Sequence, residues 1–203
     1  MKDICKFAGT ALLMLLALTL VGICFIPALT SDYDWLNILV ATLYTLVVVL
    51  AAFYEGVQRG AQDKKFTTLM EKQQQERGYQ PTEAEAQRMY RAHKGLLAGL
   101  LSGSVGIVVA LVVLFLSGEA AGWGQVAVRL ILGAFIGLYN FLPDALFPWL
   151  YLPMALIFPL CITVGYLLGP AVWKKQVASM EKAKLEKKRK VMRQRRKARK
   201  SAQ

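Results

Sequence analysis

The stretch G-L-L-A-G-L-L-S-G-S-V-G-I-V-V-A-L-V-V-L-F-L-S at residues 95–117 contains no charged side chain. A helix rises about 1.5 Å per residue, and roughly 20 apolar residues are enough to cross the hydrocarbon core of a bilayer. We therefore predict a membrane-spanning helix at this position. The fold then depends on how many other segments of the chain meet the same requirement.

Three other segments meet it. Residues 7–29 and 149–169 are free of charge, and residues 35–54 are apolar apart from one Asn and two Thr side chains. The whole chain is 56% hydrophobic and 19% charged, whereas a soluble domain carries about 25% charged residues. The sequence predicts an all-α integral membrane protein with four transmembrane helices.

Basic residues predict which ends of these helices face the cytoplasm, because short cytoplasmic loops retain Lys and Arg. Lys2 and Lys6 precede the first span, and the central segment has eight bases against five acids. The connections at residues 30–34 and 118–124 have acids and no base. We expect a plasma-membrane protein with both termini in the cytoplasm. The expected order is a cytoplasmic N-terminus (1–6), a transmembrane hairpin (7–56), a cytoplasmic helical hairpin (57–94), a transmembrane bundle (95–170) and a basic cytoplasmic tail (171–203).

A fifth apolar run, at residues 125–142, conflicts with this orientation. The chain must cross the membrane an even number of times between two cytoplasmic segments, yet residues 95–169 contain three apolar runs. Small or polar residues recur about every four positions in the fifth run and form one stripe on a helix: Gln125, Arg129, Gly133, Gly137, Asn140 and Asp144. We predict that 125–142 is a re-entrant or interfacial helix at the outer face. Five full spans, with one basic segment on the other side, remain the alternative.

The central segment contains signals for two helices. The second span continues without a breaker to about Arg77, and residues 78–81 supply turn chemistry. Thr82 and Glu85 match a capping box, which predicts a second helix running through Tyr90 and His93 into the third span. The two helices of 57–94 are expected to pack against each other as a connector. The alternative is a docking site for a protein partner.

Glycines at four-residue spacing predict close helix packing within the membrane, because small residues allow two backbones to approach. The candidate packing residues are Gly95, Gly99, Gly103, Gly133, Gly137, Gly165 and Gly169. The spacing leaves open whether the packing joins helices of one chain or of two copies, so an oligomer is one alternative.

Arg129, Asn140 and Asp144 form a candidate polar site, because ionisable groups inside a membrane are costly and often functional. A structural anchor is the alternative reading of the same residues. The sequence contains no phosphate-binding loop, no metal-ligand spacing and no nucleophile with a base nearby. We expect a protein that is not an enzyme and has no cofactor and no metal site.

The tail has the clearest binding chemistry. Residues 171–203 carry 14 Lys and Arg against two acids, a net charge of +12 that equals the net charge of the whole chain. Such a segment is expected to bind anionic lipid headgroups, at about 1 kcal/mol per basic residue. RNA or the ribosome is the alternative partner. The candidate binding residues are Lys187, Lys188, Arg189, Lys190, Arg193, Arg195, Arg196, Lys197, Arg199 and Lys200.

Three motifs carry a resemblance to known proteins: Glu55-Gly56, the run Y-R-A-H-K-G at 90–95, and Pro159 followed by G-Y-L-L-G at 165–169 before a basic end. The combination resembles small, uncharacterised multi-pass membrane proteins of Gram-positive bacteria, a resemblance that implies no activity. A cytoplasmic hairpin, an intramembrane arginine and a basic tail also resemble the architecture of YidC/Oxa1-type insertases. In this chain Arg129 lies on the short outer helix and not on the first core span.

These features predict a non-enzymatic interaction or accessory component of the membrane. The alternatives are an insertase-like biogenesis factor and a small transporter subunit.

Overall fold

A computed structural model of the chain describes residues 2–24, 34–116, 119–132, 135 and 147–201. Every regular element in this part is a helix: α1 (Lys2–Cys24), α3 (Asp34–Arg77), α4 (Glu83–Arg88), α5 (Ala92–Leu114), α6 (Glu119–Ile131) and α8 (Phe147–Ser201). The helices α1, α3, α5 and α8 are long and apolar enough to cross a membrane. The prediction of an all-α chain with four such helices is confirmed.

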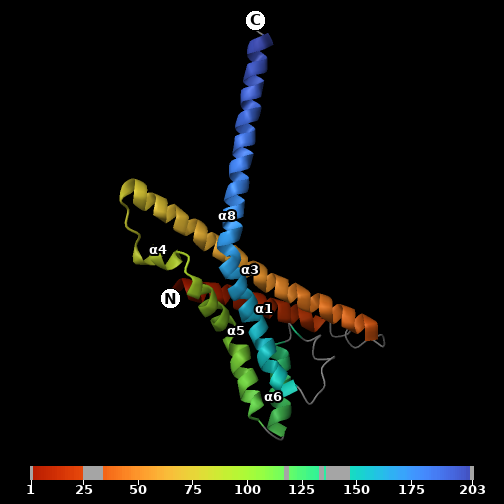
Figure 1. Cartoon of the computed structure of the whole chain (residues 1–203). Coiled ribbons are helices and arrows are strands. Elements are labelled where there is room, and N and C mark those ends of the chain that lie inside the picture. Colours follow the sequence, from red (N-terminus) through yellow and green to blue (C-terminus); the bar gives the residue numbers. More distant parts are fainter. Residues whose placement is uncertain (1, 25–33, 117–118, 133–134, 136–146, 202–203) are drawn as a thin grey trace.

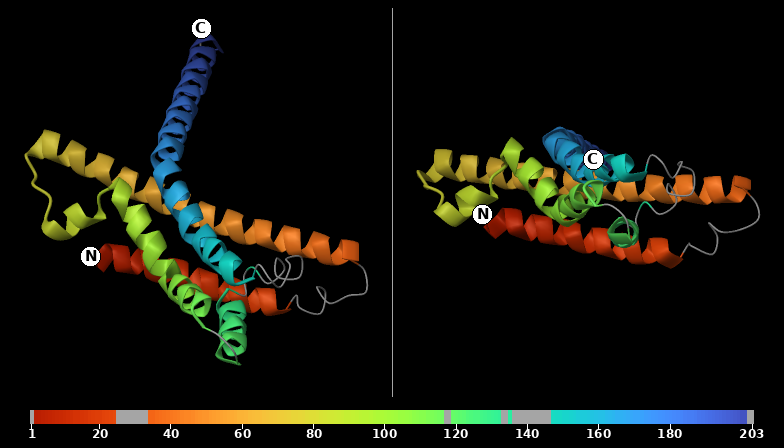
Figure 2. Two further views of the ribbon diagram at one scale, coloured as in Figure 1. Left: turned by 60° about the horizontal axis from the view of Figure 1, so that its bottom comes forward. Right: turned by 90° about the horizontal axis from the view of Figure 1, so that it is seen from below.

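The bundle is built around α8, which packs along both α3 and α5. Figure 1 shows α8 crossing α3 at an angle, while both views of Figure 2 show α1 running alongside the first part of α3. The Tyr44 hydroxyl on α3 donates a hydrogen bond to the Leu18 carbonyl on α1. Helix α6 packs against α5.

The core follows one face of α8. Phe158, Ile162 and Tyr166 recur every four residues, and all three are fully buried. Large apolar side chains such as Leu160 and Leu168 on the other face of α8 are exposed. A helix that is apolar all round suits an environment of lipid, where outward-facing leucines carry no penalty.

The structure of the central segment, residues 57–94, agrees in part with the prediction from the sequence. Helix α3 continues unbroken to Arg77, and Gly78 then adopts a positive φ of 64°, which reverses the chain at low cost for a glycine. The predicted capping box is present, since the Thr82 hydroxyl accepts from the Glu85 N–H and the Glu85 carboxylate accepts from the Thr82 N–H.

The prediction that the second helix continues into the third span is wrong. Helix α4 ends at Arg88 and α5 begins at Ala92, with extended backbone at Met89 and Arg91. Between them, the Tyr90 N–H donates to the Thr67 hydroxyl at 2.8 Å. This contact with α3 replaces a hydrogen bond that a continuous helix would have made within itself, so tertiary packing explains the break.

The limits of the fifth apolar run also differ from the prediction. Helix α6 begins at Glu119, six residues before the expected start, and ends at Ile131, well before residue 142. Ala120 and Ala121 favour helix, which explains the early start of α6. Residues 133–134 and 136–142 of the predicted helix lie outside the described residues.

Helix α8 is one helix of 55 residues that contains Pro153, Pro159 and Pro170. It bends where it passes α3 and then leaves the bundle, as Figures 1 and 2 show; a proline inside a helix is a common cause of such a bend. Every residue from Lys182 to Met192 is exposed. We call residues 182–201 the basic arm.

Candidate functional site

A network of charged side chains joins all four long helices at one end of the bundle. We call it the ion network; it consists of Asp3, Arg59, Asp63, Lys94 and Tyr166. The Lys94 Nζ lies 2.7 Å from Asp63 Oδ2 and also pairs with the Asp3 carboxylate. Arg59 donates to Asp3 Oδ1 at 2.7 Å, and its Nε lies 3.6 Å from Asp63 Oδ1. The Tyr166 hydroxyl donates to Asp63 Oδ2 at 2.8 Å.

The network is buried where its charges are densest. Lys94 is 2% exposed and Asp63 is 5% exposed, whereas the Arg59 side chain is 27% exposed. Two carboxylates and two cations give the network no formal net charge. Charges removed from water are tolerated only when they are paired and hydrogen-bonded. The pairing therefore makes the position of each helix depend on the other three.

Aromatic rings cover the network. The rings of Tyr90 and Tyr166 stack with centroids 5.1 Å apart, and the Phe7 ring lies 5.8 Å from that of Tyr166. The Arg59 guanidinium lies 5.8 Å from the centre of the Phe7 ring, within the range of a cation–π contact. Asp3 lines two small cavities beside the network, of about 60 and 170 Å³. His93 is exposed and lines the smaller cavity.

Glycines bring α3 and α8 into backbone contact next to the network. A Cβ added to Gly165 would collide with the Phe53 carbonyl, and one added to Gly169 would collide with the backbone of Gly60. Gly60 in turn lies against the Tyr166 carbonyl. Pro170 has no N–H to donate to that carbonyl, which is its i−4 partner. The small residues and the proline thus produce a close crossing of α3 and α8.

The predicted glycine stripe of α5 also faces α8. A Cβ on Gly95 would meet the Tyr166 ring at 2.7 Å, and one on Gly99 would lie 2.7 Å from the Pro159 carbonyl oxygen. A Cβ on Gly103 would collide with the Pro159 ring. These glycines thus face a helix of the same chain. Gly133 and Gly137 lie outside the described residues.

The predicted polar site is not assembled in the described part of the chain. Arg129 is half-buried in the last turn of α6, where a cation interacts favourably with the helix dipole. Asn140 and Asp144 lie outside the described residues. The ion network, more than 30 positions away from Arg129 in the sequence, is the buried charged site that the structure does describe.

The predicted tail residues continue α8. Lys187, Lys188, Arg189 and Lys190 are exposed on the basic arm. The helix continues through Arg193, Arg195, Arg196, Lys197, Arg199 and Lys200 to Ser201. Because α8 also contains the buried Tyr166, one helix connects the ion network to the basic arm.

The ion network is not among the sites predicted from the sequence. The sequence places Arg59, Asp63 and Lys94 in the cytoplasmic hairpin predicted at 57–94, and Asp3 in the N-terminal segment 1–6. The Arg59–Asp63 pair at i,i+4 was a local signal, but such pairs are common on solvated helices. Within the described residues, no group of three or more His, Cys, Asp or Glu side chains could hold a metal ion. The side chains of the ion network make ion pairs and hydrogen bonds.

No protein-family model, no curated protein and no solved structure matches this chain.

Proposed function

We propose that this protein is a non-enzymatic component of the plasma membrane that presents the basic arm to an anionic surface, chiefly the anionic lipid of its own leaflet. The observation that carries the proposal is the exposed charge of the basic arm, which follows the buried part of α8 that contains Tyr166. A four-helix bundle tied together by charge pairs provides a rigid base for that helix.

The ion network supports the proposed topology. Asp3 at the start of α1, Asp63 of α3, Lys94 at the start of α5 and Tyr166 of α8 meet at one end of the bundle. The N-terminus, the α3–α5 connection and the basic arm therefore lie toward the same end. The excess of Lys and Arg in these segments favours the cytoplasm as the compartment at that end.

Helix α6 has contacts that support a re-entrant path. A Cβ on Gly124 would lie 2.8 Å from Leu116 near the far end of α5, and the Leu132 side chain lies against Gly106 near its middle. At about 1.5 Å per residue, the 13 residues of α6 are too short to cross the bilayer. Ala155 of α8 lies beside Gly106, near the middle of α5. The residues of α8 before Ala155 therefore lie toward the end of the bundle that is opposite the ion network. We propose four spans, with the segment after α5 entering and leaving at the outer face.

The arm has the charge for lipid binding. Lys182, Lys184, Lys187 and Lys188 lie within two helical turns of one another and are all exposed. Each basic residue near an anionic leaflet contributes about 1 kcal/mol to association, and salt weakens the effect.

A fluorophore at Ser201 tests the lipid proposal. The three cysteines are replaced, Ser201→Cys is labelled with an environment-sensitive dye, and the protein is reconstituted into neutral or anionic vesicles. We expect a blue shift only with anionic lipid, reversed as salt is raised. A matched variant with Lys187, Lys188, Arg189 and Lys190 changed to Gln should lose most of the shift. The same spectrum in both lipids would contradict the proposal.

RNA of the ribosome is the second candidate partner, and the geometry of the arm favours it. Residues 171–203 contain neither Gly nor Pro, and α8 projects away from the bundle in Figure 1. At about 1.5 Å per residue, the end of the arm reaches roughly 45 Å from Pro170, beyond the headgroups if the helix stays straight. Ribosome co-sedimentation that is lost in the four-Gln variant, together with no lipid-dependent shift, would favour RNA.

A further inference from the structure

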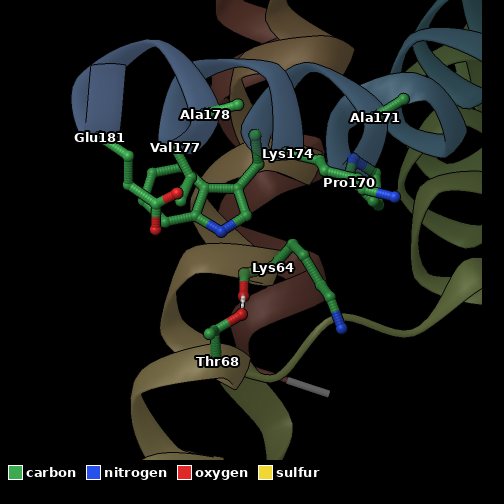
Figure 3. A pocket seen from close by; sticks show the side chains of 9 residues that line it. Lys64, Thr68, Pro170, Ala171, Lys174, Val177, Ala178 and Glu181 are labelled. Carbon is green, nitrogen blue, oxygen red and sulfur yellow. Dashed lines mark hydrogen bonds between the residues drawn. The ribbon is translucent and has the colours of Figure 1, made fainter. Parts of the chain in front are cut away.

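A groove opens between α3 and α8 just beyond their crossing at Gly60 and Gly169. It encloses about 610 Å³, within the usual size of small-molecule pockets of about 300–1,000 Å³. Figure 3 shows Lys64 and Thr68 of α3 on one side, with Val177 and Glu181 of α8 on the other. The lining residues are Lys64, Thr68, Pro170, Ala171, Trp173, Lys174, Val177, Ala178 and Glu181.

The groove combines an apolar lining with a positive rim. Pro170, Ala171, Val177 and Ala178 supply small apolar side chains, and the Trp173 ring adds a large one. Lys64 and Lys174 line the same space, and the Lys65 Nζ lies 5.9 Å from the centre of the Trp173 ring. Glu181 is the one acid among the nine lining residues. This arrangement is complementary to a ligand with an apolar chain and an anionic head.

The position of the groove along α8 indicates where such a ligand would come from. The charge-free stretch of α8 ends at Trp173, and Lys174 is the first charged residue of the helix; both line the groove. If α8 crosses the membrane, the groove lies at the boundary between hydrocarbon and headgroups. Tryptophan is enriched at that depth of the membrane, and Trp173 would lie there.

We propose that this groove binds one anionic phospholipid from the surrounding leaflet. The upper part of an acyl chain would lie against Trp173 and Val177, and the phosphate would pair with Lys64 and Lys174. This inference rests on the proposed membrane insertion of the bundle. It is independent of the basic arm, because none of the groove residues belongs to residues 182–201.

Trp173 can report the occupant directly. Trp35, Trp123 and Trp149 are all exposed, so each can be changed to Phe to leave Trp173 as the one tryptophan of the full chain. The protein is reconstituted into neutral vesicles that contain a small, equal fraction of either brominated phosphatidylglycerol or brominated phosphatidylcholine. We expect the anionic brominated lipid to quench Trp173 more strongly than a random distribution of that lipid around the protein would. The neutral brominated lipid should quench Trp173 only as much as a random distribution predicts.

Two variants test the chemistry of the groove. Lys64→Gln with Lys174→Gln should weaken the preference for the anionic lipid about thirtyfold, because each of the two lysines contributes about 1 kcal/mol near an anionic headgroup. Ala178→Phe retains the charges but fills the groove and should reduce quenching by both lipids. Lys187→Gln with Lys188→Gln is the matched control on the arm and should leave the quenching of Trp173 unchanged.

The outcomes separate this inference from the proposed function. A second single-tryptophan protein retains Trp35, and equal quenching of Trp35 by both lipids establishes insertion. Absence of Trp35 quenching would overturn the membrane proposal itself. With Trp35 quenched, equal quenching of Trp173 by both lipids would overturn the groove inference alone. Displacement of the lipid by soluble glycerol phosphate would overturn it in favour of a free phosphate compound, and loss of quenching at high protein density would overturn it in favour of a second copy.

Discussion

Tyr166 of α8 and Asp63 of α3 are 103 residues apart in sequence and joined by a 2.8 Å hydrogen bond between buried side chains. The same carboxylate oxygen of Asp63 pairs with Lys94 of α5. Asp63 thus connects α3 to both α5 and α8. Changes at Asp63 and its partners should therefore test what holds these helices together.

Removal of Lys94 should destabilise the bundle strongly. Lys94→Met leaves Asp3 and Asp63 with Arg59 as the remaining cation of the network, and an uncompensated buried charge costs about 3–5 kcal/mol. We expect a lower Tm in detergent, measured by thermal unfolding with size-exclusion detection. Lys72→Met, at an exposed position of α3, is the matched control and should leave the Tm within error.

A double variant tests whether charge pairing is the cause. Lys94→Met with Asp63→Asn removes one charge of each sign and retains an acceptor for the Tyr166 hydroxyl. It should recover a large part of the Tm lost in Lys94→Met, because the imbalance of charge is gone. If the double variant is as unstable as the sum of the two single changes, the packing of Lys94 is what matters, and the charge argument is wrong.

Gly60→Ala should separate α3 from α8. A Cβ on Gly60 would collide with the Tyr166 carbonyl, which is backbone and cannot rotate away. Overpacking of this kind costs about 1–3 kcal/mol. Gly9→Ala on α1 is the control, since nothing lies within 4 Å of a Cβ there. The Tm of Gly60→Ala should fall below that of Gly9→Ala, and equal values would contradict the close crossing.

The four helices that are long and apolar enough to cross a membrane were predictable, because length and hydropathy depend on the composition of continuous stretches. The helix break at Met89–Arg91 was not, because that segment contains no Gly or Pro and breaks through the contact of Tyr90 with Thr67. The ion network was not predictable either. Asp3 and Lys94 are 91 positions apart and meet only after the helices pack. In the sequence, each of them looks like an ordinary exposed charge at the end of a membrane helix. The glycine stripe of α5 was visible, but its partner, Pro159 on α8, required the fold.

The Glu85 carboxylate should make the α3–α4 connection sensitive to acid. Hydrogen bonds from the Thr82 N–H, the Tyr79 hydroxyl and the Thr82 hydroxyl hold the pKa of Glu85 below its usual value. A lowered folded-state pKa stabilises the capped helix at neutral pH. That stabilisation is lost as the pH falls through the unfolded value of about 4.3 and then through the folded pKa. Protection of residues 82–88 in hydrogen exchange, corrected for intrinsic rates, should decline over this range.

Glu85→Gln is the control for that measurement. Glutamine retains an acceptor oxygen for the Thr82 N–H but does not titrate, so the protection should be lower at neutral pH and independent of pH below it. A decline of the same size in Glu85→Gln would assign the acid sensitivity to another group.

Cysteine labelling should separate four spans from five. Gly122 in α6 has nothing within 4 Å of an added Cβ, so Gly122→Cys should be tolerated. In a cysteine-free background we expect an impermeant thiol reagent to label Gly122→Cys and Asp144→Cys from outside intact cells. Ser201→Cys should react only after permeabilisation. Labelling of Asp144→Cys from the cytoplasmic side alone would establish five spans.

The continuity of α8 predicts a fixed distance between the bundle and the arm. Spin labels at Leu168 and Met192, both exposed, are separated by about 36 Å along a helix that rises about 1.5 Å per residue. Double electron–electron resonance should give a narrow distribution near that value. Ala183→Pro, in the exposed part of the helix, removes one hydrogen bond and should shorten and broaden the distribution, whereas Ala183→Leu should leave it unchanged. A broad distribution in the unmodified sequence would show that the arm is not an extension of α8. In that case the distal basic residues could lie on the bilayer surface without a bend in a helix, which would remove the geometric argument for RNA.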